Sequence, residues 1–197
     1  MLNKENKELK KKIINKNRTI IMVRIALFVA LITAGAFVRI PLPFGDYVTL
    51  QIFFVIFSGL MLGPIYGSLA VVFYIALGLF GLPIFAGGGG LDYIIRPTFG
   101  YLIGFIISAF VVGIIAFKKE KLWKYFVACF VGIIITYIIG LTYKYFALNY
   151  WFGGESVALW AMIVSCVPVY LPCDIVLSII AAILGFKLKK YAQIGNK

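Results

Sequence analysis

Apolar residues in this chain form long uninterrupted blocks, which short segments containing proline, glycine or charged side chains separate. A helix needs about 20 apolar residues to cross a bilayer. The pattern therefore predicts an all-α polytopic membrane protein with six transmembrane helices. The expected spans cover about residues 19–38, 48–62, 66–82, 98–117, 123–146 and 172–188.

The last apolar segment contains two prolines, Pro168 and Pro172. Proline lacks a backbone N–H and its ring clashes with the preceding helical turn. We therefore predict a short helix at about residues 157–170, a break, and a final span that begins near Pro172. Non-helical backbone at membrane depth is tolerated only where protein or a cavity surrounds it, so we expect such surroundings at the break.

Residues 81–98, between the third and fourth expected spans, have an unusual composition. Helix breakers stand at both ends, and glycine occupies positions 87–90. The segment lacks the GxxxxGK[ST] pattern of a phosphate-binding loop. We predict a long ordered loop whose backbone approaches a ligand or folds as a lid, because glycine adopts conformations closed to other residues. The alternative is a flexible connector.

Composition and charge support the membrane assignment. Hydrophobic residues make up 63% of the chain and charged residues only 13%, whereas soluble domains carry about 25% charged residues. The net charge is +12, but 16 of the 19 Lys and Arg lie in three blocks at residues 4–24, 118–124 and 187–197. Nucleic acid as a partner would need one continuous basic face, so it is excluded.

The basic blocks also predict the orientation of the chain. Basic residues favour the cytoplasmic side of a membrane, so we expect both termini in the cytoplasm and the protein in the cell (plasma) membrane. The predicted organisation is a basic cytoplasmic segment at residues 1–18, a six-helix substrate-binding membrane domain at residues 19–190, and a cytoplasmic tail at residues 191–197.

Residue types that support catalysis are scarce. The chain has no histidine, and its three cysteines show no metal-ligand spacing. Histidine metal sites and Ser-His or Cys-His catalysis are therefore excluded. We predict no enzymatic activity, no cofactor and no metal. Cys129, Cys166 and Cys173 lie in apolar segments and are expected to be small buried hydrophobes.

Three polar residues near the outer ends of the spans are candidates for binding a ligand, because polar groups in membrane segments are costly. Asp174 stands in an apolar segment, where its carboxylate would accept N–H bonds from a ligand or stabilise a helix N-terminus. Arg96 would clamp a carboxylate with two hydrogen bonds or extend to lipid headgroups. The Gln51 amide would bond a ligand or a neighbouring helix.

Aromatic residues surround the glycine-rich loop, and they would pack against an apolar ligand body or anchor the chain at the membrane interface. They are Phe85, Tyr93, Phe99 and Tyr101. Together with two loop glycines and the polar candidates, they define the predicted substrate-binding set. That set is Gln51, Phe85, Gly87, Gly88, Tyr93, Arg96, Tyr101 and Asp174.

Small residues recur every four positions on one face of the first span, at Ala26, Ala30 and Ala34. Such spacing lets another helix approach closely. The face would dock another membrane subunit or pack inside this chain.

Several motifs occur in a fixed order along the chain. They are VTLQ at residues 48–51, GLMLGPIYG at 59–67, GLPIFAGG at 81–88, PTFGYLIGF at 97–105, and LPCD at 171–174 followed by Ala181-Ala182. In these motifs the chain resembles the BioY family, the biotin-binding S components of energy-coupling-factor (ECF) transporters. The resemblance covers roughly residues 20–190, almost the whole chain.

The resemblance implies six helices with the ligand near the outer face, under the loops that join spans 1–2, 3–4 and 5–6. It also implies that the small-residue face docks on a transmembrane coupling protein and that two cytoplasmic ATPase subunits hydrolyse ATP. Biotin suits the candidate residues. Its ureido ring would bond Asp174 and Gln51, its apolar parts would contact the aromatic residues, and its carboxylate would bond Arg96.

Two positions depart from the family pattern. Cys173 stands where the family usually has glycine, and Leu177 stands where many members have lysine. The missing lysine leaves open another carboxylate vitamin or precursor, such as lipoate or dethiobiotin. A self-sufficient secondary transporter is a further alternative, although coupling charges deep in the spans are scarce. A purely structural membrane subunit would not explain the glycine loop together with Asp174 and Arg96.

Overall fold

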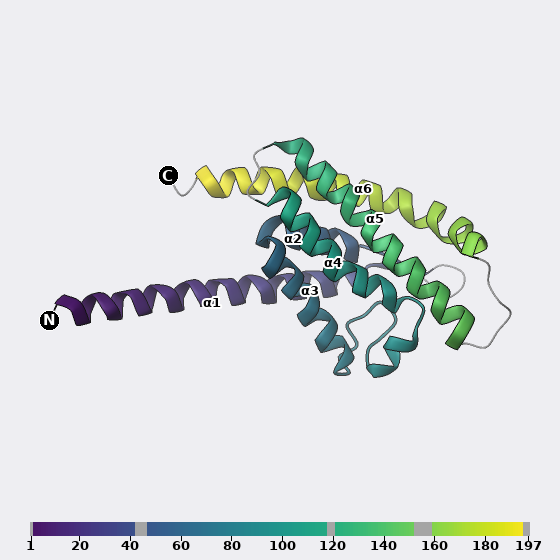
Figure 1. The fold of residues 1–197 in the computed structure, drawn as a ribbon, viewed down its shortest axis with the longest axis horizontal. Coiled ribbons are helices and arrows are strands. Elements are labelled where there is room, and N and C mark those ends of the chain that lie inside the picture. The colour runs from purple at the N-terminus through teal and green to yellow at the C-terminus, as the bar shows by residue number, and fades with distance from the viewer. Residues whose placement is uncertain (1, 42–46, 118–120, 152–158, 195–197) are drawn as a thin grey trace.

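The computed structural model describes residues 2–41, 47–117, 121–151 and 159–194. The described part folds into a bundle of α-helices, from which the N-terminal half of the first helix projects (Figure 1). The helices are α1 (Leu2–Phe37), α2 (Gln51–Leu62), α3 (Pro64–Leu79), α4 (Phe99–Ala116), α5 (Leu122–Phe146) and α6 (Leu159–Ile194).

Within the described residues, four segments are long and apolar enough to cross a membrane. They are Asn17–Phe37, Phe99–Ala116, Leu122–Trp151 and Val167–Lys189. The helices α2 and α3 are apolar but only 12 and 16 residues long. The helical, multi-pass architecture agrees with the expectation from the sequence, and the count of six crossings stays a prediction. The predicted boundary at residue 18 falls inside α1, which runs through it without interruption.

The predicted break in the last segment is wrong, because α6 is a single helix of 36 residues with Pro168 and Pro172 inside it. Each proline removes one backbone donor, and the rest of the hydrogen-bond ladder is sufficient to continue the helix. Helix-interior prolines are tolerated in membrane helices because neighbouring groups compensate for the freed carbonyls.

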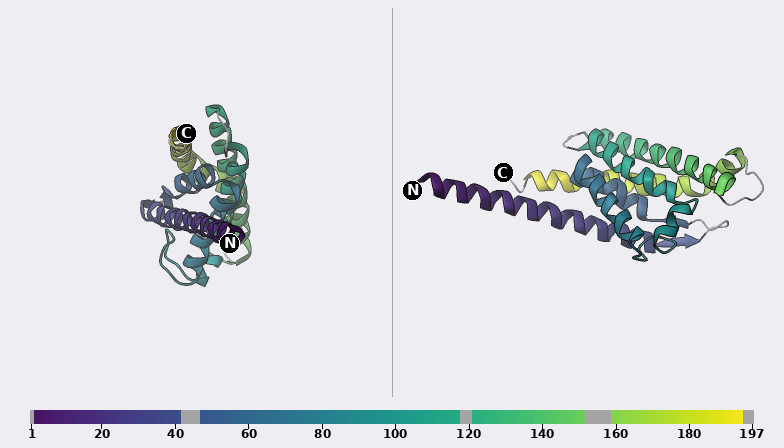
Figure 2. Two further views of the ribbon diagram at one scale, coloured as in Figure 1. Left: turned by 90° about the vertical axis from the view of Figure 1, so that its left-hand side faces the viewer. Right: turned by 60° about the horizontal axis from the view of Figure 1, so that its bottom comes forward.

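Close helix packing depends on glycines that face neighbouring backbones. A side chain at Gly104 would meet the Thr136 backbone of α5 at 3.0–3.1 Å, and one at Gly67 would meet the Ser58 and Gly59 backbone of α2 at 2.8 Å. Small residues let helices approach closely where lipid supplies no hydrophobic driving force. As a result α4 and α5 pack side by side, and α2 lies against both α4 and α6 (Figures 1 and 2).

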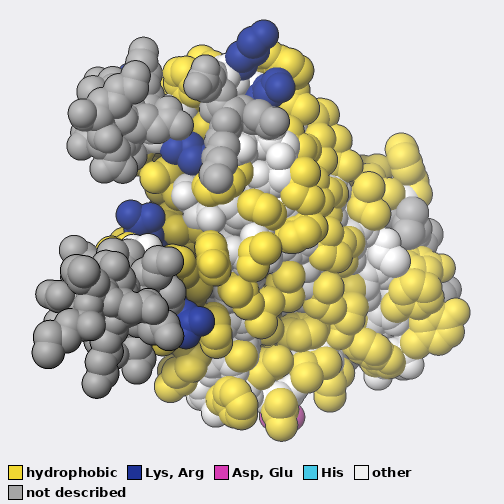
Figure 3. All heavy atoms as spheres, turned by 60° about the vertical axis from the view of Figure 1, so that its left-hand side comes forward, with side chains coloured by type: hydrophobic (Ala, Val, Ile, Leu, Met, Phe, Trp, Pro, Cys, Tyr) yellow, Lys and Arg dark blue, Asp and Glu magenta, His cyan; other side chains and the backbone are white. Residues whose placement is uncertain are grey.

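The outer surface is largely apolar. Figure 3 shows hydrophobic side chains over most of the visible face, with lysine and arginine gathered toward the end where both termini lie. Large exposed side chains include Val23 of α1, Phe73 of α3, and Phe130 and Ile138 of α5. Such a surface suits lipid contact, which agrees with the membrane class that the composition indicates.

Two irregular segments lie at the end of the bundle away from both termini (Figures 1 and 2). The first contains strands β1 (Arg39–Pro41) and β2 (Tyr47–Thr49), which pair antiparallel with Arg39 opposite Thr49. The second is the glycine-rich segment between α3 and α4, which contains the short 3-10 helix η2 (Leu91–Ile95). After α5, the π-helical turn η3 (Ala147–Trp151) ends the described part of that helix.

Candidate ligand-binding site

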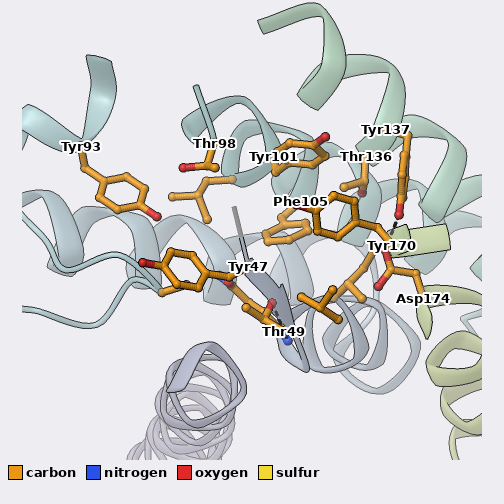
Figure 4. Close-up of a pocket in the computed structure, with 15 residues that line it drawn as sticks. Tyr47, Thr49, Tyr93, Thr98, Tyr101, Phe105, Thr136, Tyr137, Tyr170 and Asp174 are labelled. Carbon is orange, nitrogen blue, oxygen red and sulfur yellow. Dashed lines mark hydrogen bonds between the residues drawn. The ribbon is translucent and has the colours of Figure 1, made fainter. Parts of the chain in front are cut away.

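A cavity lies where β2 and the glycine-rich segment meet α2, α4, α5 and α6 (Figure 4). It holds about 710 Å³ of empty space, counting the part open to solvent. The lining residues are Tyr47, Val48, Thr49, Gln51, Ile52, Ala86, Tyr93, Thr98, Tyr101, Leu102, Phe105, Thr136, Tyr137, Tyr170 and Asp174.

A carboxylate and a phenol form the polar end of the cavity. The Tyr137 hydroxyl of α5 donates a hydrogen bond to Asp174 Oδ2 of α6 at 2.6 Å (Figure 4). The length is that of a charge-assisted bond. The bond fixes the carboxyl group in one orientation and leaves Oδ1 as a further acceptor. It also ties α6 to α5 at the wall of the cavity.

A buried amide lines the cavity at the start of α2. Gln51 is 4% exposed, and its Nε2 makes no hydrogen bond with the described residues. The Tyr74 hydroxyl lies near the amide, and it donates to the Ile84 carbonyl oxygen at 3.0 Å. Leaving a buried donor unsatisfied costs about 1–3 kcal/mol. A ligand with an acceptor at this position would remove that cost.

Aromatic rings supply much of the remaining wall. Figure 4 shows Tyr47 and Tyr93 at one end of the cavity and Tyr137 and Asp174 at the other. Tyr101 meets Tyr137 edge to face with ring centroids 6.2 Å apart. Together with Phe105 and Tyr170, these rings offer apolar faces to a ligand body and hydroxyl groups at their edges.

The glycine-rich segment is held together by its own contacts. Phe85 and Gly88 exchange two backbone hydrogen bonds, at 2.8 and 3.1 Å. The Phe85 ring is 1% exposed and packs on Tyr93 at 4.5 Å between centroids. Arg96 Nη1 donates to the Gly87 carbonyl oxygen at 2.8 Å, and its guanidinium lies 5.1 Å from the centre of the Tyr93 ring.

Comparison with known proteins identifies the relatives of this chain. A family model described as the BioY family matches residues 6–194. This chain belongs to the BioY family. It is 40% identical over 179 residues to the "Probable biotin transporter BioY" of Lysinibacillus sphaericus, and the match covers 90% of each chain. It is 40% identical over 173 residues to the "Biotin transporter BioY" of Thermotoga maritima, with 86% of this chain and 95% of that relative covered.

A solved structure has the same fold. The crystal structure at 2.1 Å of the S-component for biotin from an ECF-type ABC transporter is 27% identical, with a TM-score of 0.67. The match covers 89% of this chain and 94% of that chain. The resemblance to the BioY family that the sequence motifs indicate is therefore confirmed.

Within this BioY family member, the cavity brings together half of the predicted substrate-binding set. Gln51, Tyr93, Tyr101 and Asp174 line it. The other four predicted residues, Phe85, Gly87, Gly88 and Arg96, belong to the glycine-rich segment and are not among the lining residues. Phe99, also expected near the loop, is buried against Tyr143 of α5 with ring centroids 5.9 Å apart.

Several lining residues were absent from the predicted set, notably Tyr47, Thr136, Tyr137 and Tyr170. Thr136 and Tyr137 carry a usable signal, since they are adjacent polar residues in the middle of an apolar span. Tyr170 stands four residues before Asp174 and therefore shares its helix face, but the expected proline break concealed that relation.

The two departures from the family pattern lie beside the cavity, and neither residue lines it. Cys173 and Leu177 line an apolar groove, together with Val38, Ile40 and Val176. This groove adjoins the cavity, because Val48 and Thr49 line both. Cys173 is exposed, so its predicted burial is wrong, whereas Cys129 is buried as expected. The side chain of Cys166 falls outside the described part.

The small-residue face of α1 is open. Ala26, Ala30 and Ala34 are all exposed. The alternative in which this face packs inside the chain is therefore wrong for the described residues.

Proposed function

We propose that this chain is the substrate-binding S component of an ECF-type vitamin uptake transporter, and that it binds biotin from outside the cell. The observation that most directly supports this proposal is the pair of polar groups in the cavity. Gln51 offers a buried donor without a hydrogen-bond partner among the described residues, and Asp174 offers a fixed acceptor. A cyclic urea presents a carbonyl acceptor and N–H donors, so biotin complements both groups.

The shape of the site supports the same ligand. In the proposed complex the ureido ring lies near Asp174 and Gln51, and the thioether ring and valeryl chain lie against Tyr101, Phe105 and Tyr170. The remaining predicted residues, Phe85, Gly87, Gly88 and Arg96, then form the outer side of the site. Burying an apolar ligand body against such rings contributes about 25 cal/mol per Å² removed from water.

The open small-residue face of α1 supports docking to another membrane subunit. We propose that the face of Ala26, Ala30 and Ala34 docks on a transmembrane coupling protein and that two ATPase subunits supply the energy. In this proposal the chain crosses the membrane six times, with α2 and α3 as short crossings, and both termini and the basic loop at residues 118–124 lie in the cytoplasm. That arrangement agrees with the preference of basic residues for the cytoplasmic side.

The test is titration calorimetry of the purified chain with biotin, with lipoate and dethiobiotin as comparison ligands. We expect one-to-one binding with a dissociation constant on the order of nanomolar for biotin, since enclosure of a small ligand permits tight binding. If the chain bound lipoate or dethiobiotin but did not bind biotin, the substrate would instead be that other carboxylate. Uptake by vesicles that contain this chain without any ATPase would identify a self-sufficient secondary transporter.

A further inference from the structure

Arg96 connects two parts of the glycine-rich segment, the turn at residues 85–88 and the short helix η2 (Leu91–Ile95). Its Nη1 donates to the Gly87 carbonyl oxygen at 2.8 Å, in the turn that Phe85 and Gly88 close. Its guanidinium lies 5.1 Å from the centre of the Tyr93 ring, which belongs to η2. One planar cation thus contacts the turn and the 3-10 helix η2 at the same time.

The turn has the shape that this contact needs. A Cβ atom at Gly87 would lie 2.5 Å from Arg96 Nη1 and 3.4 Å from the Tyr93 ring. Glycine at position 87 therefore leaves the space that the guanidinium and the ring occupy. The helix η2 is anchored separately to the bundle, because the Tyr143 hydroxyl of α5 donates to the Ile94 carbonyl oxygen.

The cavity wall depends on this arrangement. Tyr93 and Ala86 line the cavity, whereas Arg96 and Gly87 do not. Arg96 is exposed, and Tyr93 is 5% exposed. The guanidinium therefore lies behind the cavity wall, against Tyr93 and next to the backbone that follows Ala86.

We propose that Arg96 is a positioning residue that holds residues 85–93 closed over the site and fixes Tyr93 in its wall. The inference deepens the proposed function and rests on it for the identity of the ligand. It differs from the expectation of a carboxylate clamp, because the effect of Arg96 on affinity is independent of the charge of the ligand.

The test compares biotin with biotinamide, its neutral amide of nearly the same size, by titration calorimetry. Arg96→Ala removes the guanidinium. Gly87→Ala keeps the cation but displaces its flexible end from the turn. We expect both variants to weaken both ligands by the same factor, about tenfold, as for loss of a hydrogen bond to a charged group. Lys124→Ala is the matched control, since Lys124 also stacks on a ring, Trp123 at 5.8 Å, away from the cavity.

A second measurement needs no ligand. The Gly88 amide donates to the Phe85 carbonyl oxygen at 3.1 Å, and the Gly90 amide donates to the Gly78 carbonyl oxygen at 2.8 Å. We expect hydrogen exchange at both amides to accelerate about tenfold in Arg96→Ala and Gly87→Ala, because local opening exposes them. Exchange in Lys124→Ala should match that of the unmodified chain.

If Arg96→Ala weakened the binding of biotin but not of biotinamide, the proposal would be overturned and Arg96 would be assigned to the ligand carboxylate. Unchanged exchange at Gly88 and Gly90, or unchanged affinity for both ligands, would overturn it as well. If the unmodified chain bound neither biotin nor biotinamide, the proposed substrate would fail, and the exchange measurement would still decide the role of Arg96.

Discussion

The bond between Tyr137 and Asp174 offers the sharpest test of the site. Tyr137→Phe removes one oxygen atom and leaves the ring in place. The lost bond is 2.6 Å long and has a carboxylate oxygen as acceptor. Hydrogen bonds to charged groups contribute about 1.5–3 kcal/mol, and about 1.4 kcal/mol corresponds to a tenfold change in affinity. We expect the dissociation constant for biotin to rise at least about tenfold, because Asp174 loses its fixed orientation.

The assay is titration calorimetry with Tyr145→Phe as the matched control. Tyr145 lies on the same helix and is not among the residues that line the cavity, so removal of its hydroxyl should leave affinity unchanged. A double-mutant cycle with Asp174→Asn then isolates the pair. Tyr137→Phe should cost much less affinity when position 174 is already asparagine. Affinity within about threefold of the unmodified chain in Tyr137→Phe would refute the role given to this bond.

Three further outcomes follow from the same geometry. Gln51→Leu should raise the thermal unfolding temperature in detergent, because it removes an unsatisfied buried donor worth about 1–3 kcal/mol, yet weaken biotin about tenfold; a lower unfolding temperature would contradict the account of Gln51. Ala30→Trp should leave biotin binding unchanged and abolish co-purification with the coupling protein, since it fills the open face of α1; intact co-purification would place the docking face elsewhere. Leu177→Lys should change the biotin dissociation constant by less than about threefold, because Leu177 lines the outer groove; a tenfold gain would show that the position reaches the ligand.

The helical architecture and part of the site follow from local sequence signals. Apolar blocks indicate helices, and isolated polar residues such as Gln51 and Asp174 stand out within them. The motif order also indicates the family. These features can be predicted from the sequence because a polar group in an apolar span is costly and therefore marks a functional position.

The remaining features depend on contacts between distant segments. The pairing of Tyr137 with Asp174 joins residues 37 positions apart, and no local pattern encodes it. The contact of Arg96 with Gly87 depends on how the glycine turn folds back. The continuity of α6 through Pro168 and Pro172 depends on surroundings that override the intrinsic preference of proline.

The two prolines also determine how stiff α6 is beside the site. Neither Pro168 nor Pro172 can donate to the carbonyl oxygen four residues earlier, so the carbonyls of Val164 and Pro168 lack their usual helical partners. The turn that carries Tyr170 is therefore joined to its neighbours by two fewer backbone bonds than a regular helix. The helix α6 therefore bends most easily between Val164 and Pro172. Just beyond this stretch, the hydrogen bond from Tyr137 to Asp174 holds α6 against α5.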